Sequence, residues 1–214
     1  MISYETTKRI IDIFGSIILI IIFLPVIVVA AIAIKFTSKG PVLADTPQRV
    51  GKDGKPFYTY KFRTMIVNAH DLLKTDPKFK KIYRELLNSG NYKLKNDPRV
   101  TPIGKILRKH SIDEVPQLIN VLKGEMSLVG PRPYYADELE VQQKKYPGTD
   151  KYVKQMLAAK PGITGFWQVS GRSDVNFDKR IRMDAYYARK KSLILDILIL
   201  LKTPWVMISG KGAA

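Results

Sequence analysis

The hydrophobic and polar positions divide the chain into an apolar N-terminal segment and a longer, mixed region. Residues 13–34 form an uncharged apolar run that Pro25 interrupts near its middle. A helix rises about 1.5 Å per residue, so a run of this length covers a hydrocarbon core about 30 Å thick. The run therefore predicts a membrane anchor over residues 1–36, followed by a polar domain over residues 37–214.

The charges around the apolar run do not favour either orientation of a membrane span. Lys8 and Arg9 precede the run, and Lys35 and Lys39 follow it, whereas the positive-inside rule needs an excess on one side. Proline bends a helix because it removes a backbone donor and clashes with the preceding turn. Pro25 therefore favours a re-entrant helix that enters and leaves by the cytoplasmic face. A straight span and a signal peptide stay open as alternatives.

After the anchor, the pattern predicts short strands and helices in turn. Glycines in residues 51–55 indicate a hairpin loop, and residues 57–63 alternate as a strand that places Lys61 and Arg63 on one face. Residues 66–87 have helical spacing and many lysines, which fits a helix on a membrane surface or a solvated helix. We expect a helix-rich α/β domain with a small sheet, lying on the membrane.

Two further helices are predicted from local signals. Ser111 and Glu114 fit a capping box, and Pro116 fits a first turn, so a helix begins within residues 111–113 and runs to Lys123, where Gly124 ends it. Residues 192–208 are apolar but include charged positions and a tryptophan. They are predicted to form a helix in the membrane interface, and a core helix is the alternative.

Composition narrows the chemistry. The chain has 36 Lys and Arg against 19 Asp and Glu, a formal net charge of +17, which attracts nucleic acid, an acidic leaflet or phosphorylated substrates. The chain contains no cysteine, which excludes disulfides, thiolate metal sites and a thiol nucleophile. It has two histidines, and neither is assigned a catalytic role.

A pair of adjacent carboxylates is the strongest candidate for chemistry. Asp113 and Glu114 stand at the start of a predicted helix, in a stretch that also contributes Arg99, Arg108 and Arg132. Capping of the helix and its dipole is the plainer interpretation, and it stays open. A carboxylate pair among arginines also suits magnesium together with phosphate, since Mg²⁺ prefers oxygen ligands such as carboxylates. Phosphate, in turn, binds well to the paired donors of a guanidinium group.

Three blocks of sequence resemble a known family. They are YKFRTM at residues 60–65, RVTPIGKILRKHSIDEVPQLINVLKGEMSLVGPRP at residues 99–133, and KPGITGFWQVSGRS at residues 160–173. With the C-terminal tail, they are similar to the bacterial sugar transferase family, the monotopic polyprenyl-phosphate phosphoglycosyl transferases. Two departures are a Pro47 where the family usually has glutamine, and Leu24-Pro25 where some members carry Ser-Pro.

The resemblance implies a reaction, its partners and its place. It implies transfer of a sugar 1-phosphate from a UDP-sugar to a polyprenyl (undecaprenyl) phosphate, with release of UMP. This is the first membrane step of exopolysaccharide, capsule or glycoconjugate synthesis. The domain would lie on the cytoplasmic face of the bacterial inner membrane, with anionic lipids and downstream glycosyltransferases as further partners. No nucleic acid is expected as a partner.

The resemblance also implies roles for individual residues. Asp113 corresponds to the nucleophile that forms a covalent aspartyl-phosphosugar intermediate, and Glu114 would orient it or help it to hold Mg²⁺. The predicted phosphate-binding residues, each within a matching block, are Lys61, Arg63, Arg132 and Arg172. Outside this family, a membrane-tethered nucleic-acid binder and a non-enzymatic scaffold are the alternatives, although no recognised nucleic-acid motif is present.

Several smaller features have two open interpretations each. Gly162 and Gly165 would allow close backbone approach or merely punctuate a loop. Asp184 would orient an arginine or form a structural salt bridge. Trp167, after Phe166, would sit against a nucleobase or in the core.

Overall fold

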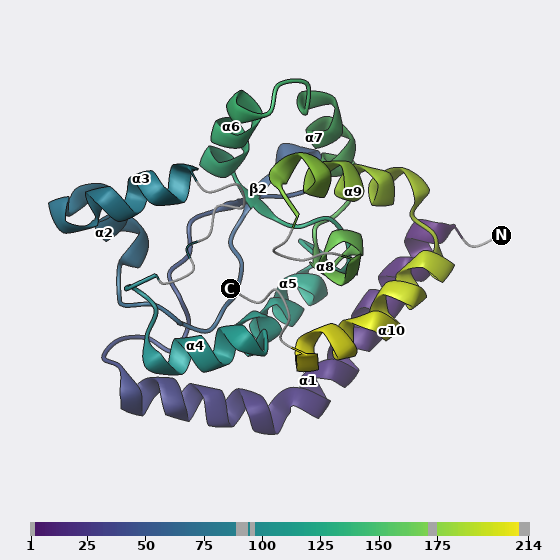
Figure 1. The fold of residues 1–214 in the computed structure, drawn as a ribbon. Helices are drawn as coiled ribbons and strands as arrows, with labels where there is room; N and C mark the ends of the chain where they lie inside the picture. The colour runs from purple at the N-terminus through teal and green to yellow at the C-terminus, as the bar shows by residue number, and fades with distance from the viewer. Residues whose placement is uncertain (1–2, 89–93, 95–96, 171–174, 210–214) are drawn as a thin grey trace.

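The computed structural model describes residues 3–88, 94, 97–170 and 175–209, and it forms a helix-rich α/β arrangement (Figure 1). The α-helices are α1 (Tyr4–Thr37), α2 (Ala69–Thr75), α3 (Lys80–Asn88), α4 (Pro102–Lys109), α5 (Leu118–Lys123), α6 (Ala136–Lys145), α7 (Asp150–Leu157), α8 (Phe166–Ser170), α9 (Phe177–Lys190) and α10 (Leu193–Ser209). The 3₁₀ helices are η1 (Lys52–Gly54), η2 (Pro77–Phe79) and η3 (Ile112–Gln117). The strands are β1 (Arg49–Val50), β2 (Pro56–Phe57), β3 (Ser127–Val129), β4 (Tyr134–Tyr135) and β5 (Gly162–Thr164).

The strands form two small sheets. In the antiparallel sheet β1 lies between β2 and β4, with Arg49 opposite both Phe57 and Tyr135. This pairing confirms the predicted hairpin around residues 51–55. In the second sheet β3 and β5 run parallel. A Cβ on Gly162 would lie 2.0 Å from the Gly130 nitrogen, so the close-approach interpretation of Gly162 is confirmed.

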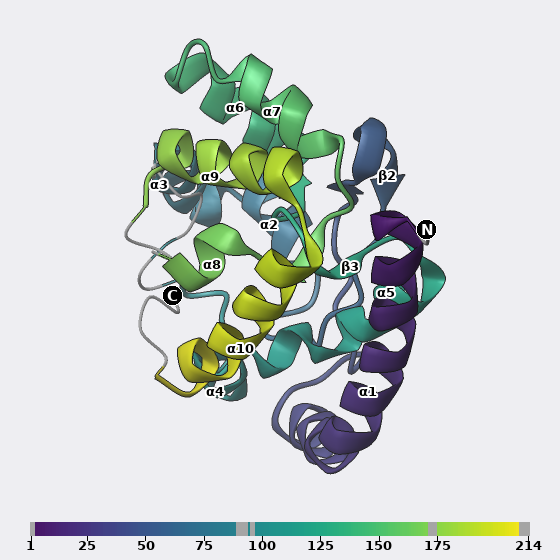
Figure 2. The same ribbon diagram turned by 90° about the vertical axis from the view of Figure 1, so that its right-hand side faces the viewer.

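Helix α1 is long, apolar and bent. Among the described residues it is the one helix that is long and apolar enough to cross a membrane, judged by length and composition. In its most apolar stretch of 18 residues, 11% are buried within the protein. Pro25 lies inside the helix, which remains continuous. Its axis nevertheless changes direction, and both views show its two halves running along different lines (Figures 1 and 2). A bend of this kind is what a proline in a helix interior produces.

One side of α1 belongs to the core of the domain. Ala30 and Ile34 are buried with Phe62 and Leu107 in one hydrophobic cluster. Nearer the N-terminus, Phe23 and its apolar neighbours pack against the larger cluster that the residues of α5, β3 and α10 form. Burying these side chains removes apolar area from water, which stabilises the docked position of the helix.

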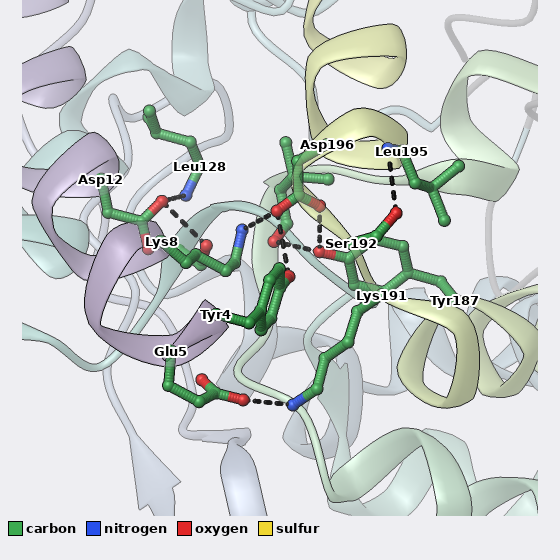
Figure 3. Close-up of polar contacts among 12 residues, drawn as sticks. Tyr4, Glu5, Lys8, Asp12, Leu128, Tyr187, Lys191, Ser192, Leu195 and Asp196 are labelled. Atoms are coloured by element: carbon green, nitrogen blue, oxygen red, sulfur yellow. Dashed lines mark hydrogen bonds and ion pairs between the residues drawn. The ribbon is translucent and has the colours of Figure 1, made fainter. Parts of the chain in front are cut away.

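Hydrogen bonds also attach the first turns of α1 to the domain (Figure 3). The Asp196 carboxylate of α10 accepts from the Tyr4 hydroxyl at 3.0 Å, the Lys8 ammonium at 2.8 Å and the Tyr187 hydroxyl at 2.6 Å. Asp196 is 6% exposed, so these donors compensate a charge that would otherwise be costly to bury.

Two more contacts extend this attachment along α1. Asp12 accepts from the Ser127 hydroxyl at 2.9 Å and from the Leu128 amide at 3.0 Å, at the start of β3 (Figure 3). Arg9 donates to the carbonyls of Val121 and Leu122 at 2.5 and 2.7 Å. These carbonyls belong to the last turn of α5, where a helix lacks internal donors and a cation is favourable.

The predicted strand over residues 57–63 is not continuous. β2 ends at Phe57, and the only later pairing in this stretch is an isolated antiparallel bridge between Phe62 and Leu43. The Tyr60 amide donates to Asn120 Oδ1 at 2.9 Å, and Asn120 Nδ2 donates to the Tyr58 carbonyl at 2.7 Å. Asn120, buried in α5, therefore takes the place of a neighbouring strand beside residues 58 and 60.

The predicted helix over residues 66–87 is also divided. It begins only at Ala69, after Asn68 with a φ of 56°, and η2 separates α2 from α3. Asp76 precedes Pro77 and is extended, with a ψ of 121°. A residue before proline is disfavoured in the helical region, which explains why the periodic pattern does not become one helix.

The helix that was expected to start within residues 111–113 has a different first half. Ser111 has a φ of 56° and makes no capping bond, and residues Ile112–Gln117 form the 3₁₀ helix η3 before α5. The predicted end is confirmed, because Gly124 closes α5 with a φ of 82°. The C-terminal run forms α10, in which Ile199 is buried and Trp205 is 76% exposed. Its place in the membrane interface stays a prediction.

Candidate active site

A cavity of about 270 Å³ opens beside η3. Asp113 and Glu114 line it together with Lys61, and the arginines of its wall come from separate parts of the chain. These arginines are Arg49, Arg63, Arg99, Arg108 and Arg132. The structure therefore brings the predicted carboxylate pair together with three of the four predicted phosphate-binding residues. The fourth, Arg172, lies outside the described residues.

Backbone hydrogen bonds place Lys61 beside the carboxylates. The Phe62 amide donates to the Asp113 carbonyl at 3.0 Å, joining segments that are far apart in sequence. The Lys61 ammonium then lies 2.7 Å from Glu114 Oε1, with both side chains partly exposed to the cavity. The pair leaves a positive charge and a negative charge adjacent to Asp113.

Asp113 is held in an environment that disfavours its charged form. It is 8% exposed, and burial raises the pKa of its carboxyl to about 6. The Lys61 ammonium lowers this pKa, the Glu114 carboxylate raises it, and the Arg108 guanidinium lowers it. A carboxylate that is poorly solvated yet ionised near neutral pH is a better nucleophile than one in water.

The arginines differ in what holds them. Arg108 Nε donates to the Thr64 hydroxyl at 2.9 Å, which aims it along the cavity wall. The Arg132 guanidinium lies 5.8 Å from the centre of the Trp167 ring, and its amide donates to Asp184 Oδ2 at 3.3 Å. Asp184 thus positions an arginine through its backbone, in line with one of the two interpretations of this residue.

Arg63 has backbone partners that the sequence did not indicate. Its Nε donates to the Pro41 carbonyl at 2.5 Å, and its Nη2 donates to the Ser38 carbonyl at 3.0 Å. It therefore ties the chain leaving α1 to the cavity wall. Its phosphate-binding role stays a prediction, with part of the guanidinium already engaged.

Several buried polar atoms in the cavity wall lack a hydrogen-bond partner within the described part of the chain. They are Nε of Arg49, Nε of Arg132, Nε1 of Trp167 and Oε1 of Gln168. Native proteins rarely leave such groups unpaired. These three unpaired donors and one unpaired acceptor indicate that the cavity receives a polar ligand or ordered water.

Comparison with known proteins gives these side chains a family context. Residues 3–210 match the family described as bacterial sugar transferase. The chain belongs to the bacterial sugar transferase family. The matched range covers α1, the segments that line the cavity and α10.

Individual relatives of this family member carry related names. An undecaprenyl-phosphate galactose phosphotransferase of Salmonella typhimurium is 45% identical over 99% of this chain and 42% of its own length. A UDP-glucose:undecaprenyl-phosphate glucose-1-phosphate transferase of Klebsiella pneumoniae is 38% identical over 96% of this chain and 41% of its own. The chain therefore spans less than half of these relatives. The exopolysaccharide production protein ExoY of Rhizobium meliloti is 38% identical over 96% of this chain and 87% of its own.

The sugar transferase site has a donor set that fits magnesium only with a phosphorylated ligand. Within the described ranges, no three acidic or histidine side chains gather into a group that could enclose a metal. Asp113 and Glu114 supply two adjacent carboxylates at the cavity. Mg²⁺ commonly binds through one or two carboxylates plus substrate phosphates and waters, so these residues fit that mode.

The sequence analysis did not identify two residues of the cavity wall, His70 and Tyr135. His70 Nε2 lies 3.1 Å from the Tyr135 hydroxyl. Trp167 is 4% exposed, which supports the core interpretation, although it also borders the cavity. Nothing local to residue 70 marks it as a site residue. Tyr135 had one weak signal, its closeness to Arg132 in the sequence.

Proposed function

We propose that this protein transfers a sugar 1-phosphate from a UDP-sugar to a polyprenyl phosphate such as undecaprenyl phosphate, releasing UMP. The observation that carries the proposal is the pairing of Asp113 and Glu114 with Lys61 and arginines in one cavity. Phosphoryl transfer needs positive charge around a diphosphate and a positioned nucleophile. The family membership and the names of the relatives support the same reaction.

The position of the site above α1 supports a lipid acceptor. Ile112 and Phe62, the neighbours of Asp113 and Lys61, pack in one cluster with Ala30 and Ile34 of the apolar helix. A lipid with its chain beside α1 would therefore present its phosphate close to Asp113. A soluble donor and a membrane-bound acceptor can use one site in turn if a covalent intermediate separates the two steps.

The proposed chemistry proceeds in two displacements. In the first, an Asp113 carboxylate oxygen attacks the β-phosphorus, and the bond from that phosphorus to the bridging oxygen breaks, so that UMP leaves with the electron pair. In the second, a phosphate oxygen of the lipid attacks the same phosphorus and Asp113 leaves as a carboxylate. Arg132 and Arg108 stabilise the charge on the phosphates in both steps.

Glu114 and Lys61 have supporting roles in this scheme. Lys61 holds Glu114 through their 2.7 Å ion pair and favours the ionised form of Asp113. Asp113 and Glu114 would also hold Mg²⁺, which when bound supplies further positive charge to the diphosphate.

A panel of UDP-sugars tests the reaction class and identifies the donor together. The full chain in detergent or nanodiscs is mixed with undecaprenyl phosphate, Mg²⁺ and each of UDP-galactose, UDP-glucose and UDP-N-acetylgalactosamine, and UMP is measured. We expect release with at least one donor, dependent on the lipid and on the metal. If the membrane-associated protein released no UMP from any of these donors, the result would favour a non-enzymatic scaffold.

The pKa of Asp113 predicts the pH dependence of the donor reaction. Since the carboxylate is the reactive form and its pKa is about 6, kcat/KM for the UDP-sugar should fall about tenfold per pH unit below that value. Lys61→Met removes a cation that lowers this pKa, so the acidic limb should move to higher pH. The measurement is UMP release between pH 5 and 8.5.

Lys55→Met, on the exposed loop after η1, is the matched control for this pH profile and should leave the limb in place. An acidic limb that stays unmoved in Lys61→Met would show that a group other than Asp113 titrates.

We also propose that α1 is re-entrant, with both ends on the cytoplasmic face of the inner membrane. Its bend around Pro25 and its basic flanks support this arrangement, and anionic lipids would attract the flanks. The chain lacks cysteine, so Ser3→Cys and Ser38→Cys can be labelled singly in spheroplasts and in inverted vesicles. Both should react only from the cytoplasmic side. Labelling of the two positions from opposite sides would instead establish a span.

A further inference from the structure

A second, smaller cavity of about 40 Å³ opens beside the first turns of α1, and no residue lines both this cavity and the candidate active site. We call it the basic pocket, because its charged lining consists of five cations and two acids. They are Lys8, Arg9, Lys52, Lys160 and Lys191 with Glu5 and Asp12. Sites for drug-sized ligands measure about 300–1,000 Å³. The basic pocket therefore suits one compact group and not a nucleotide or a sugar.

The acids of the basic pocket already have partners within the protein. Glu5 pairs with Lys191, and Lys8 pairs with Asp196 of α10 (Figure 3). Asp12 is 3% exposed, and its Oδ1 accepts two hydrogen bonds from the start of β3. These contacts leave the remaining cations of the basic pocket without a dedicated carboxylate.

Three cations of the basic pocket are not neutralised in this way. Arg9 donates only to carbonyls in the last turn of α5, and the ammonium groups of Lys52 and Lys160 have no ion pair or hydrogen bond within the described part of the chain. A Cβ on Gly124 would lie 3.5 Å from Arg9 Nη2 and 3.6 Å from Lys160 Nζ, so both cations reach the same small space. Lys160 opens the family-matching block at residues 160–173, yet the proposed reaction gives it no role.

The positive charges around Lys160 repel one another. Burial lowers the pKa of its ammonium, and the neighbouring Arg9 and Lys52 lower it further. The acids of the lining, Asp12 and Glu5, raise this pKa only in part. An anion beside Lys160 would relieve the repulsion and accept charge-assisted hydrogen bonds.

The basic pocket lies at headgroup depth when α1 enters a membrane. The apolar run begins at Ile13, four residues after Arg9, and four residues of helix rise about 6 Å. The headgroup layer of each leaflet is about 5–8 Å thick, since a core of about 30 Å grows to about 40–45 Å with headgroups. Ile10 and Phe14, in the same turns of α1, are 47% and 63% exposed. A group in the basic pocket would therefore lie level with lipid phosphates.

We propose that the basic pocket binds the phosphate of an anionic phospholipid headgroup, held by Lys160 and Lys52 with Arg9 beside them. The proposal rests on the membrane attachment proposed above for α1, and it adds a lipid site that is separate from the acceptor of the reaction. The phosphodiester of phosphatidylglycerol carries one negative charge and no cation of its own. It therefore complements unpaired ammonium groups, whereas phosphatidylcholine carries its own cation.

Binding of single lipids to the full chain in a nonionic detergent tests the site without a bilayer and without turnover. Phosphatidylglycerol is titrated into the protein, and native mass spectrometry counts the lipids that each molecule keeps. Lys160→Met should weaken binding of one phosphatidylglycerol about fivefold, and Lys52→Met combined with Lys160→Met about thirtyfold. These factors correspond to about 1 kcal/mol for each lysine beside an anionic headgroup. Phosphatidylcholine should bind more weakly and equally to all variants.

Lys154→Met on α7 and Lys55→Met after η1 are the matched controls, because both lysines are exposed and neither lines the basic pocket. Each should bind phosphatidylglycerol within about twofold of wild type. Lys160→Met should also keep its melting temperature in lipid-free detergent. Its UMP release in phosphatidylcholine nanodiscs should stay at the wild-type rate, since Lys160 does not line the active-site cavity.

Two results would overturn the proposal. Equal binding of phosphatidylglycerol by wild type and the double variant would show that the basic pocket is not the lipid site. Displacement of the lipid by excess inorganic phosphate, which the proposal expects to leave the lipid bound, would assign the pocket to a soluble phosphate. The assay uses neither a donor sugar nor a bilayer, so a failure of the transfer reaction or of the re-entrant arrangement would be recognised separately.

Discussion

Asp113→Asn is expected to lower sugar-phosphate transfer by at least about 10³-fold, because the amide that replaces the carboxylate cannot form the acyl phosphate. The fold should survive the change. Burial raises the pKa of Asp113, so a neutral side chain of the same shape is no harder to bury than the native one. UMP release measures the first effect, and thermal unfolding in detergent measures the second.

The intact mass of the protein provides the direct readout. Wild type mixed with the UDP-sugar and Mg²⁺, but without lipid acceptor, should gain the mass of one sugar phosphate, and Asp113→Asn should not. Asp53→Asn, on the exposed turn η1, is the control and should behave as wild type. Robust turnover by a wild-type protein that never gains this mass would show direct attack by the lipid phosphate and would leave Asp113 as a metal ligand.

Arg132→Gln is expected to lower kcat/KM by about 10²-fold to 10³-fold, the cost of removing a donor aimed at developing phosphate charge. The Arg132 guanidinium borders the cavity and has a buried Nε without a hydrogen-bond partner in the described chain. Its position over Trp167 and the hold of Asp184 on its amide fix where it points. The rate of UMP release measures the loss.

Arg182→Gln is the control for Arg132, because Arg182 lies on the exposed side of α9, where it pairs with Asp178 and Tyr152. It should leave the rate unchanged. If Arg132→Gln lowered the unfolding temperature but kept full activity at low temperature, Arg132 would only support the packing of Trp167.

The sequence was informative where chemistry is local. The apolar run with Pro25, the adjacent Asp113 and Glu114, and Lys61 in its motif were all visible as short patterns, and the structure brings Lys61 and the carboxylates into one cavity. The hairpin and the glycine that ends α5 were also predicted, because turn geometry depends on a few neighbouring residues.

The failures have tertiary causes. Alternation over residues 57–63 predicted one strand, but residues 58 and 60 bond to the Asn120 side chain and Phe62 forms only an isolated bridge with Leu43, and no local pattern can show these partners. Arg63 lies in a motif with Lys61, yet part of it bonds to the carbonyls that follow α1. His70 and Tyr135 come together only because the fold joins distant segments, so periodicity gave no indication that both residues line the cavity.

The attachment of α1 has a practical consequence for preparing this protein. We do not expect removal of the first 36 residues to give a water-soluble fragment. The start of β3 would lose its acceptor Asp12, and the last turn of α5 would lose its donor Arg9. The buried Asp196 carboxylate would lose its ion pair with Lys8. The apolar side chains that pack against Ala30 and Ile34, among them Phe62 and Leu107, would be exposed to water. Detergent or nanodiscs are therefore a requirement of the fold itself.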